Sequence, residues 1–340
     1  MPLKRKRERT TYEPPQPQDS PWGGLRSRFL ASLEAADQVR IFDLSTRTSR
    51  TLHRWAARYP LIRRVRVWPL SLSVAAGAPF TSVEALISTA RLSLWVFTID
   101  DLFDEERVPQ GELNKRAERY RRLAHGAMPC PSGDSLAFAL CETRDDLATY
   151  PLFESLGTEW ANSLCGTIDG MQREYEWSRR YRKGADPDAW LPSYDEYRAT
   201  GRYSIGGPPH IWAALITSED PSTPRHLDHL REMEEIASTC IRLANDLQSY
   251  QKEIKEGKIN SIVILSRQLR ERGVSEQAAY EQAEARVRAD IASGLDRLTL
   301  LRNASVTDTG RPEAAIDNIA RFVCDFYTHH DYHTFLAQAA

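Results

Sequence analysis

LWVFTIDDLFDEE, residues 94–106, is an apolar run that ends in a cluster of acidic side chains. On a helix, Asp100 and Asp104 lie on one face, and Asp101 lies beside them. Carboxylates this close repel one another, so the helix end is either solvated or paired with a cation. Mg²⁺ suits this place, because it is a hard ion that takes one or two carboxylates, keeps several waters and binds substrate phosphates. The stretch therefore predicts a helix that ends in a solvated acidic face or in a metal site.

A second stretch, IRLANDLQSYQKEIKE at residues 241–256, favours the metal site. Asn245, Ser249 and Glu253 recur every four residues, so they project from one face of a helix over two turns. Their amide, hydroxyl and carboxylate oxygens suit magnesium and do not suit zinc. Two clusters of oxygen donors on separate helices predict a diphosphate held between them through bound metal ions.

The two motifs together resemble those of the class I terpene synthases of microbial type. The segment DDLFD at 100–104 matches the aspartate-rich motif of that family, and NDLQSYQKE at 245–253 matches its second motif, NDxxSxxKE, without a gap. The resemblance covers nearly the whole chain after about residue 25. It implies an all-α helical bundle around a central cavity, three Mg²⁺ ions with Mn²⁺ able to substitute, and a linear prenyl diphosphate as substrate. The implied metal ligands are Asp100, Asp101, Asp104, Asn245, Ser249 and Glu253, and Lys252 is implied to contact the diphosphate.

The composition of the chain limits the other function classes. With 45 basic and 47 acidic residues, the net charge of −2 gives no general attraction to nucleic acid. Five cysteines without paired short spacings predict reduced thiols and a cytoplasmic location. No apolar run approaches the roughly 20 residues that span a bilayer. Residues 1–20 are basic and Pro-rich, which predicts a disordered tail without a secretory signal, more often a plain basic tail than a nuclear address.

The remaining pattern is helical, with breakers at regular intervals, and we expect residues 21–340 to form one domain. No segment alternates as a strand would, so the fold class is all-α. The cluster Arg144, Asp145 and Asp146 resembles a metal motif, but its arginine favours a surface ion pair. The helices are expected over residues 26–38, 49–59, 82–101, 112–124, 136–150, 155–182 and 275–301, and from 194 onward.

The stretch YDEYRATGRYSIGGPPHIWAAL, residues 194–215, predicts a helix that breaks, because glycine loosens a helix and proline removes its hydrogen bonds. The bland interpretation is one helix followed by another. The family resemblance implies instead a break facing the cavity, at Gly206, and an arginine before it that senses diphosphate. Arg202 is the match for this arginine, and Arg198 is the competing candidate.

The C-terminal end departs from the family, which closes with an Arg-Tyr pair that contacts diphosphate. The best match here is Asp331 and Tyr332, of which Tyr332 can donate a hydrogen bond whereas Asp331 would repel an anion. Histidines at 329, 330 and 333 are candidates to compensate. The aromatic side chains expected to line the cavity and to steady a carbocation, although each alone is more often ordinary core, are Trp95, Phe97, Phe103, Trp160 and Trp212.

The resemblance implies a cyclase, and the run TGRYSIG favours geranylgeranyl diphosphate over farnesyl diphosphate as its substrate. A chain-elongating prenyl transferase is the first alternative, but it normally carries a second aspartate-rich motif. A non-catalytic helical protein is the other alternative, and it leaves the two oxygen-donor motifs unexplained. Homodimers are common in the family, which makes one possible here.

Overall fold

The computed structural model describes residues 25–104, 108–182 and 191–332, and these residues form helices without any strand. The predicted all-α fold is confirmed. The predicted tail at 1–20 lies outside the described residues. The α-helices are α1 (Arg28–Ala31), α2 (Ala35–Ala56), α3 (Val67–Gly77), α4 (Val83–Asp104), α5 (Gln110–Ala124), α6 (Ser135–Leu147), α7 (Phe153–Arg182), α8 (Tyr194–Ser204), α9 (Gly207–Ile216), α10 (Leu227–Glu256), α11 (Ser261–Glu271), α12 (Glu276–Ala304) and α13 (Arg311–Tyr327), with 3₁₀ turns η2 (Arg64–Arg66) and η4 (Thr223–His226).

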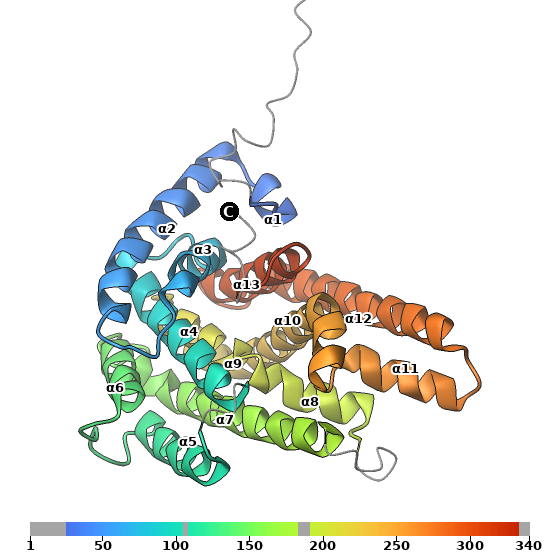
Figure 1. The fold of residues 1–340 in the computed structure, drawn as a ribbon. Coiled ribbons are helices and arrows are strands. Elements are labelled where there is room, and N and C mark those ends of the chain that lie inside the picture. Colours follow the sequence, from blue (N-terminus) through green and yellow to red (C-terminus); the bar gives the residue numbers. More distant parts are fainter. Residues whose placement is uncertain (1–24, 105–107, 183–190, 333–340) are drawn as a thin grey trace, which may run out of the picture.

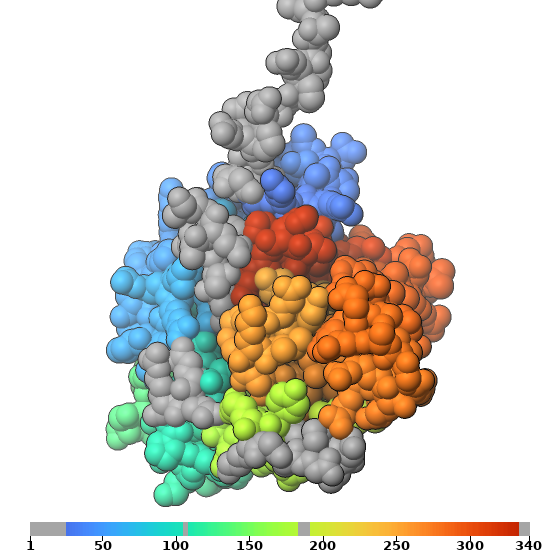
Figure 2. Space-filling model, turned by 45° about the vertical axis from the view of Figure 1, so that its right-hand side comes forward, coloured from blue at the N-terminus to red at the C-terminus, as the bar shows by residue number. Residues whose placement is uncertain are grey.

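The helices that carry the two motifs, α4 and α10, lie on either side of α9 (Figure 1). Helix α10 packs on α8, α11, α12 and α13, while α4 packs on α2, α3 and α6. Figure 2 shows the C-terminal part of α10 in amber beside α11 in orange, with α13 in red above it. The arrangement brings two segments that are about 140 residues apart in the chain to the same side of the bundle. None of the described helices combines the length and the apolarity that a bilayer span requires.

Helix α4 is buried on nearly every side, which explains why its sequence is apolar almost all round. Side chains such as Leu94, Trp95 and Ile99 are almost fully shielded from solvent. The helix ends in acidic residues only in its last turn, at Asp100, Asp101 and Asp104. The packing of α4 in the core thus fixes the position of the carboxylate cluster at the end of this helix.

The predicted break after residue 204 is present: α8 ends at Ser204 and α9 begins at Gly207. Between them, Gly206 adopts a left-handed conformation with φ +77°, which other residues rarely take. A Cβ atom at Gly206 would lie 2.5 Å from Cγ1 of Val96 on α4. Glycine therefore allows both the turn and the close approach of α9 to α4.

At the N-terminal end the predicted helices differ from the observed ones. The segments expected at 26–38 and 49–59 are a short α1, capped by Ser27 Oγ, and one long α2 that starts at Ala35. Apolar residues of α2 continue at helical spacing through the polar stretch between the two predicted segments, so packing extends the helix there. The expected surface ion pair is confirmed, since Arg144 Nη2 lies 2.6 Å from Asp145 at an exposed edge.

Asp220 ties the loop after α9 to the loop before α13. Its buried carboxylate accepts hydrogen bonds from the backbone amides of Ser222 at 2.9 Å and Thr309 at 2.8 Å, and from both hydroxyls. Although burial opposes ionisation, these bonds lower the pKa of Asp220 to about 2.

Replacing Asp220 with alanine is expected to lower the free energy of unfolding by about 2–4 kcal/mol, because several buried donors lose their acceptor. The pKa is lower in the folded chain, so this stabilisation is present above about pH 4 and is lost as the pH falls toward 2. Urea unfolding of both chains at several pH values measures it. Asp308→Ala, which removes an exposed carboxylate from the same loop, should change stability by less than about 0.5 kcal/mol. Equal losses in the two variants would contradict the assignment.

Candidate active site

A cavity of about 630 Å³ opens where α4, α7, α8 and α10 meet. It is lined by acidic and amide side chains from both predicted motifs, which the structure brings together as the family resemblance implies. A side pocket of about 60 Å³ shares Val96, Phe97, Ile205 and Tyr327 with it. The motif residues in the wall of the larger cavity are Asp100, Asp101, Asp104, Asn245, Ser249, Lys252 and Glu253.

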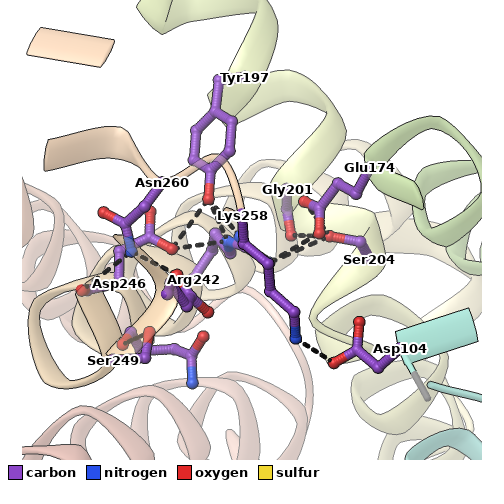
Figure 3. Close-up of polar contacts among 12 residues, drawn as sticks. Asp104, Glu174, Tyr197, Gly201, Ser204, Arg242, Asp246, Ser249, Lys258 and Asn260 are labelled. Atoms are coloured by element: carbon purple, nitrogen blue, oxygen red, sulfur yellow. Dashed lines mark hydrogen bonds and ion pairs between the residues drawn. The ribbon is translucent and has the colours of Figure 1, made fainter. Parts of the chain in front are cut away.

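The first motif places the carboxylates of Asp100 and Asp104 in the cavity wall. Burial, and after it the nearby Asp104, raises the pKa of the Asp100 carboxyl well above its ordinary value. Asp104 lies 2.7 Å from Nζ of Lys258, which follows α10 (Figure 3). Although burial opposes the charge of Lys258, the Asp104 carboxylate raises the pKa of this lysine. The lysine thus balances an acidic cluster that otherwise needs a cation to stay ionised.

Asp101, which was also predicted as a metal ligand, lines the cavity but is paired with two arginines. Both of its oxygens accept from the buried guanidinium of Arg66, at 2.8 and 2.7 Å, and Arg63 lies 3.3 Å away. This two-point pairing satisfies a carboxylate that the sequence pattern had placed on the inward face. We therefore assign Asp101 to positioning α4 against the turn at η2.

The second motif presents three different oxygen donors along α10. The side chain of Asn245 forms no hydrogen bond with the part of the chain that the structure describes. Ser249 Oγ donates to the Asn245 carbonyl at 2.9 Å, and Glu253 accepts from Asn260 Nδ2 at 2.7 Å. Burial raises the pKa of Glu253 to about 7. The amide oxygen of Asn245 is free to bind a cation, and a cation beside Glu253 would offset the cost of keeping its buried carboxylate ionised.

These donors fit Mg²⁺, which accepts few protein ligands and completes its shell with water and phosphate oxygens. Among the described residues, no three His, Cys, Asp or Glu side chains converge as a metal site of their own. Instead, the cavity wall combines carboxylates from α4 with an amide, a hydroxyl and a carboxylate from α10. These groups provide too few ligands for a metal ion by themselves, so the oxygens of a bound phosphate would complete its coordination.

Arg242 is the buried cation of the cavity wall, and the sequence-based assignment missed it. Its guanidinium lies 3.0 Å from Asp246 and 3.2 Å from Glu174, and it also bonds the hydroxyl of Tyr197 (Figure 3). A Cβ atom on Gly201 would lie 2.9 Å from Cγ of Arg242. The arginine therefore reaches from α10 into a space that α8 leaves open just before its break.

The two arginines predicted to sense diphosphate lie elsewhere. Arg202 stacks on the ring of Tyr203, 4.4 Å from its centroid, and faces Glu235 at 3.7 Å. Arg198 lies over Tyr194 and 3.7 Å from Asp195. Neither lines the cavity. The signal for Arg242 was available in the sequence, because it precedes Asn245 by three residues and so shares its helix face.

Lys252 lines the rim of the cavity and is more exposed than the other motif residues. Its side chain is 62% exposed and lies 3.8 Å from Glu256 on the next turn. This position leaves the ammonium group able to reach an anion at the cavity mouth.

Of the predicted aromatic lining, Phe97 and Phe103 face the cavity. The three tryptophans are buried in the core and line none of the described pockets. Trp95 donates to the Leu136 carbonyl at 2.8 Å, and Trp160 packs on Phe153. Trp212, only 2% exposed, lies in the same core. The helical spacing of these aromatic residues predicted that they are buried, but it could not show whether they line the cavity or pack in the core. Tyr175 and Tyr327 are lining residues that we did not predict.

The C-terminal pair is divided between two places. Asp331 lines the cavity, whereas Tyr332 is buried in the side pocket, where its hydroxyl lies 3.1 Å from Ser73 Oγ and its ring stacks on Phe326. Tyr332 is therefore not placed to contact an anion beside the metal motifs. His330 accepts from the Arg26 amide, and His329 lines a different cavity. His333 lies outside the described residues.

That other cavity, of about 810 Å³, lies behind α10 between α12 and α13. Among its described lining residues only Asp325 carries a carboxylate, and Asp325 already accepts from Ser27 and Phe29. It is larger than the motif-lined cavity, but none of the predicted metal ligands lines it.

Comparison with known proteins agrees with this geometry. A family model described as terpene synthase family 2, C-terminal metal binding, matches residues 91–293, more than half of the chain. Ent-pimara-8(14),15-diene synthase of Oryza sativa subsp. japonica is 30% identical over 257 residues, which cover 70% of this chain and 30% of that protein. Pristinol synthase of Streptomyces pristinaespiralis is 25% identical over 270 residues, covering 72% of this chain and 64% of that protein. The chain spans about a third of the length of the plant relatives.

Solved structures share the fold. 2-Methylisoborneol synthase from Streptomyces coelicolor A3(2), solved with Mg²⁺ and geranyl-S-thiolodiphosphate, superposes with a TM-score of 0.67 at 16% identity. The match covers 85% of this chain and 90% of that one. At this identity the likeness concerns the helical architecture alone.

Proposed function

This chain belongs to the class I terpene synthases of family 2, and from that premise we propose that it ionises a linear prenyl diphosphate, cyclises the hydrocarbon and releases diphosphate. The observation that carries the proposal is the meeting of two oxygen-donor motifs and one buried arginine in the wall of a single cavity. Relatives named as terpene synthases support the same reaction class.

In this proposal the cavity would hold three Mg²⁺ ions, which Mn²⁺ could replace. Asp100 and Asp104 would hold them on the α4 side, and Asn245, Ser249 and Glu253 on the α10 side. When bound, these ions supply the positive charge that stabilises the departing diphosphate.

Other side chains of the cavity would bind the diphosphate and stabilise the carbocation. Arg242 donates hydrogen bonds to the diphosphate from its buried position, and Lys252 and Lys258 add charge at the rim. Phe97 and Phe103 lie in the cavity wall, where their rings would stabilise the carbocation, and a dry cavity would protect it from capture by water. Asp331 at the mouth replaces the arginine found in the family, so anion binding depends more heavily on Arg242.

We favour geranylgeranyl diphosphate as the substrate and keep farnesyl diphosphate as the alternative. The run TGRYSIG supports the longer substrate, through its likeness to bacterial diterpene cyclases. We also propose that residues 21–340 act as one catalytic domain behind the tail at 1–20, in the cytoplasm, with a homodimer as the candidate assembly. A prenyl transferase fits less well, because the second motif presents an asparagine, a serine and a glutamate in place of aspartates. A non-catalytic role leaves the converging motifs without a purpose.

The direct test is to incubate the purified chain with Mg²⁺ and, separately, with geranyl, farnesyl, geranylgeranyl and geranylfarnesyl diphosphate. Hydrocarbon extracts are analysed by gas chromatography and mass spectrometry, and released diphosphate is measured in parallel. A cyclic product from one substrate supports the proposal and gives the chain length. Longer linear diphosphates, formed when isopentenyl diphosphate is added, would identify an elongating enzyme instead.

Removing divalent metal with EDTA is expected to reduce diphosphate release by at least about 10³-fold, because the charge that stabilises the leaving group is lost. Added Mg²⁺ or Mn²⁺ should restore it. The circular dichroism spectrum is the control and should not change, since the helices of the described residues pack through a core of buried apolar side chains. Undiminished release in EDTA would contradict the proposed chemistry.

A further inference from the structure

The side pocket behind Phe97 contains one nitrogen base in otherwise apolar and hydroxyl-bearing surroundings. His210 of α9 lies there with Ser73, Ser93, Tyr327 and Tyr332 as the other polar lining residues. Hydroxyl oxygens are weak bases, whereas a neutral imidazole has a basic lone pair. The pocket adjoins the cavity in which the carbocation would form, because the two share four lining residues.

The fold fixes His210 at this place. The left-handed turn at Gly206 brings α9 close to α4, and His210 follows one helical turn later. Nδ1 of His210 then lies 2.7 Å from Oγ of Ser93 on α4. Burial lowers the pKa of His210 to about 4, so the imidazole is neutral at pH 7.

Ser93 lies between two hydrogen-bond partners, one of which is His210. The hydroxyl of Ser93 has a single hydrogen, which goes either to the Thr89 carbonyl at 3.1 Å or to Nδ1 of His210 at 2.7 Å. We assign it to the Thr89 carbonyl, so that Ser93 accepts from Nδ1–H of His210 and Nε2 carries no hydrogen. Nε2 forms no hydrogen bond with the described residues. A free lone pair thus lies on an imidazole whose orientation is fixed by its other nitrogen.

Building on the proposed function, we propose that Nε2 of His210 is the base that ends the reaction by accepting a proton from the carbocation. A C–H bond next to the cationic carbon breaks, its electron pair forms the C=C bond, and the proton moves to Nε2 to give an imidazolium. The imidazolium passes this proton to water or to the released diphosphate when the product leaves. A buried imidazole is a sufficient base, because the C–H bond beside a cationic carbon is far more acidic than an imidazolium.

The test compares His210→Asn with the unchanged chain. Asparagine retains a donor toward Ser93 but has no basic nitrogen. Diphosphate release should continue, because ionisation takes place at the metal motifs. The main hydrocarbon should fall by at least about tenfold relative to isomers deprotonated elsewhere and to alcohols, as expected when a positioned base is lost. Gas chromatography with mass spectrometry gives the ratio, and released diphosphate gives the ionisation rate.

Ser93→Ala provides a second variant, which removes the acceptor that fixes the tautomer and should shift the product ratio in the same direction. Ser71→Ala is its matched control: Ser71 is a buried serine that also donates to the carbonyl four residues before it, but it lines no described pocket. Its product ratio should stay that of the unchanged chain. A shift in both serine variants would indicate general repacking and overturn the inference.

Two further outcomes would overturn it in different ways. An unchanged product ratio in His210→Asn would mean that another group, such as diphosphate, takes the proton. Loss of diphosphate release in a folded His210→Asn chain would place the residue in ionisation instead. If the unchanged chain releases diphosphate from none of the four substrates, the proposed function itself fails and the inference falls with it.

Discussion

Asn245→Ala is expected to reduce diphosphate release by about 10³-fold, or about 4 kcal/mol of transition-state stabilisation, since it removes one of the proposed oxygen ligands of the metal. The fold should persist, because the Asn245 side chain forms no hydrogen bond with the described residues. Higher Mg²⁺ concentrations should recover part of the activity, as expected when an ion is bound more weakly. Release rates measured across a magnesium titration give both effects.

Gln248→Ala is the matched control for this prediction. Gln248 lies on the same helix three residues later, but its side chain faces the cavity behind α10 and not the one lined by the motifs. It should retain the rate and the magnesium dependence of the unchanged chain. Full activity of Asn245→Ala at limiting magnesium would remove the second motif from the site and with it the main support for the proposed chemistry.

The spacing of the motif residues was sufficient to predict the helices that carry them, whereas the cavity that they share was implied by the family resemblance. Helical periodicity fixes which side chains lie on one face, so Asn245, Ser249 and Glu253 could be grouped without a structure. The apolar run before Asp100 likewise predicted a helix buried on most sides, as α4 is. These inferences depend on local geometry alone.

Tertiary contacts were not predictable in this way. Asp101 has the same spacing relation to its neighbours as a ligand would have, but Arg66, from a turn 35 residues earlier, occupies both of its oxygens. Tyr332 adjoins Asp331 in the chain, yet it inserts beside Phe326 while Asp331 remains at the cavity. The sequence gives no register for such long-range pairings, because they depend on how separate helices pack.

The arginine beside the helix break shows the same limit. Position along α8 pointed to Arg202, but the side chain that fills this part of the cavity comes from α10, through the space left by Gly201. Function at a site is therefore predicted more securely for residues within one helix than for residues that reach the site from another.

Arg242→Lys is expected to lower kcat/KM by about 10²-fold. Lysine keeps the charge but loses the planar set of donors that bonds Glu174, Asp246 and an anion at the same time. Loss of one charge-assisted interaction that strengthens in the transition state has about this effect, or roughly 2–3 kcal/mol. The affinity for inorganic diphosphate in the presence of Mg²⁺, measured by calorimetry, should fall by a similar factor.

A purely structural role for Arg242 predicts a different pattern, which makes the prediction sharp. The arginine is buried against two carboxylates, so its replacement also lowers stability, and unfolding alone cannot identify its function. Arg202→Lys is the control, because Arg202 also precedes the break but lies outside the cavity lining, over Tyr203. It should bind diphosphate as the unchanged chain does. If Arg242→Lys loses thermal stability while its diphosphate affinity stays that of Arg202→Lys, then Arg242 only holds α10 against α7 and α8, and the anion is bound by the lysines at the rim.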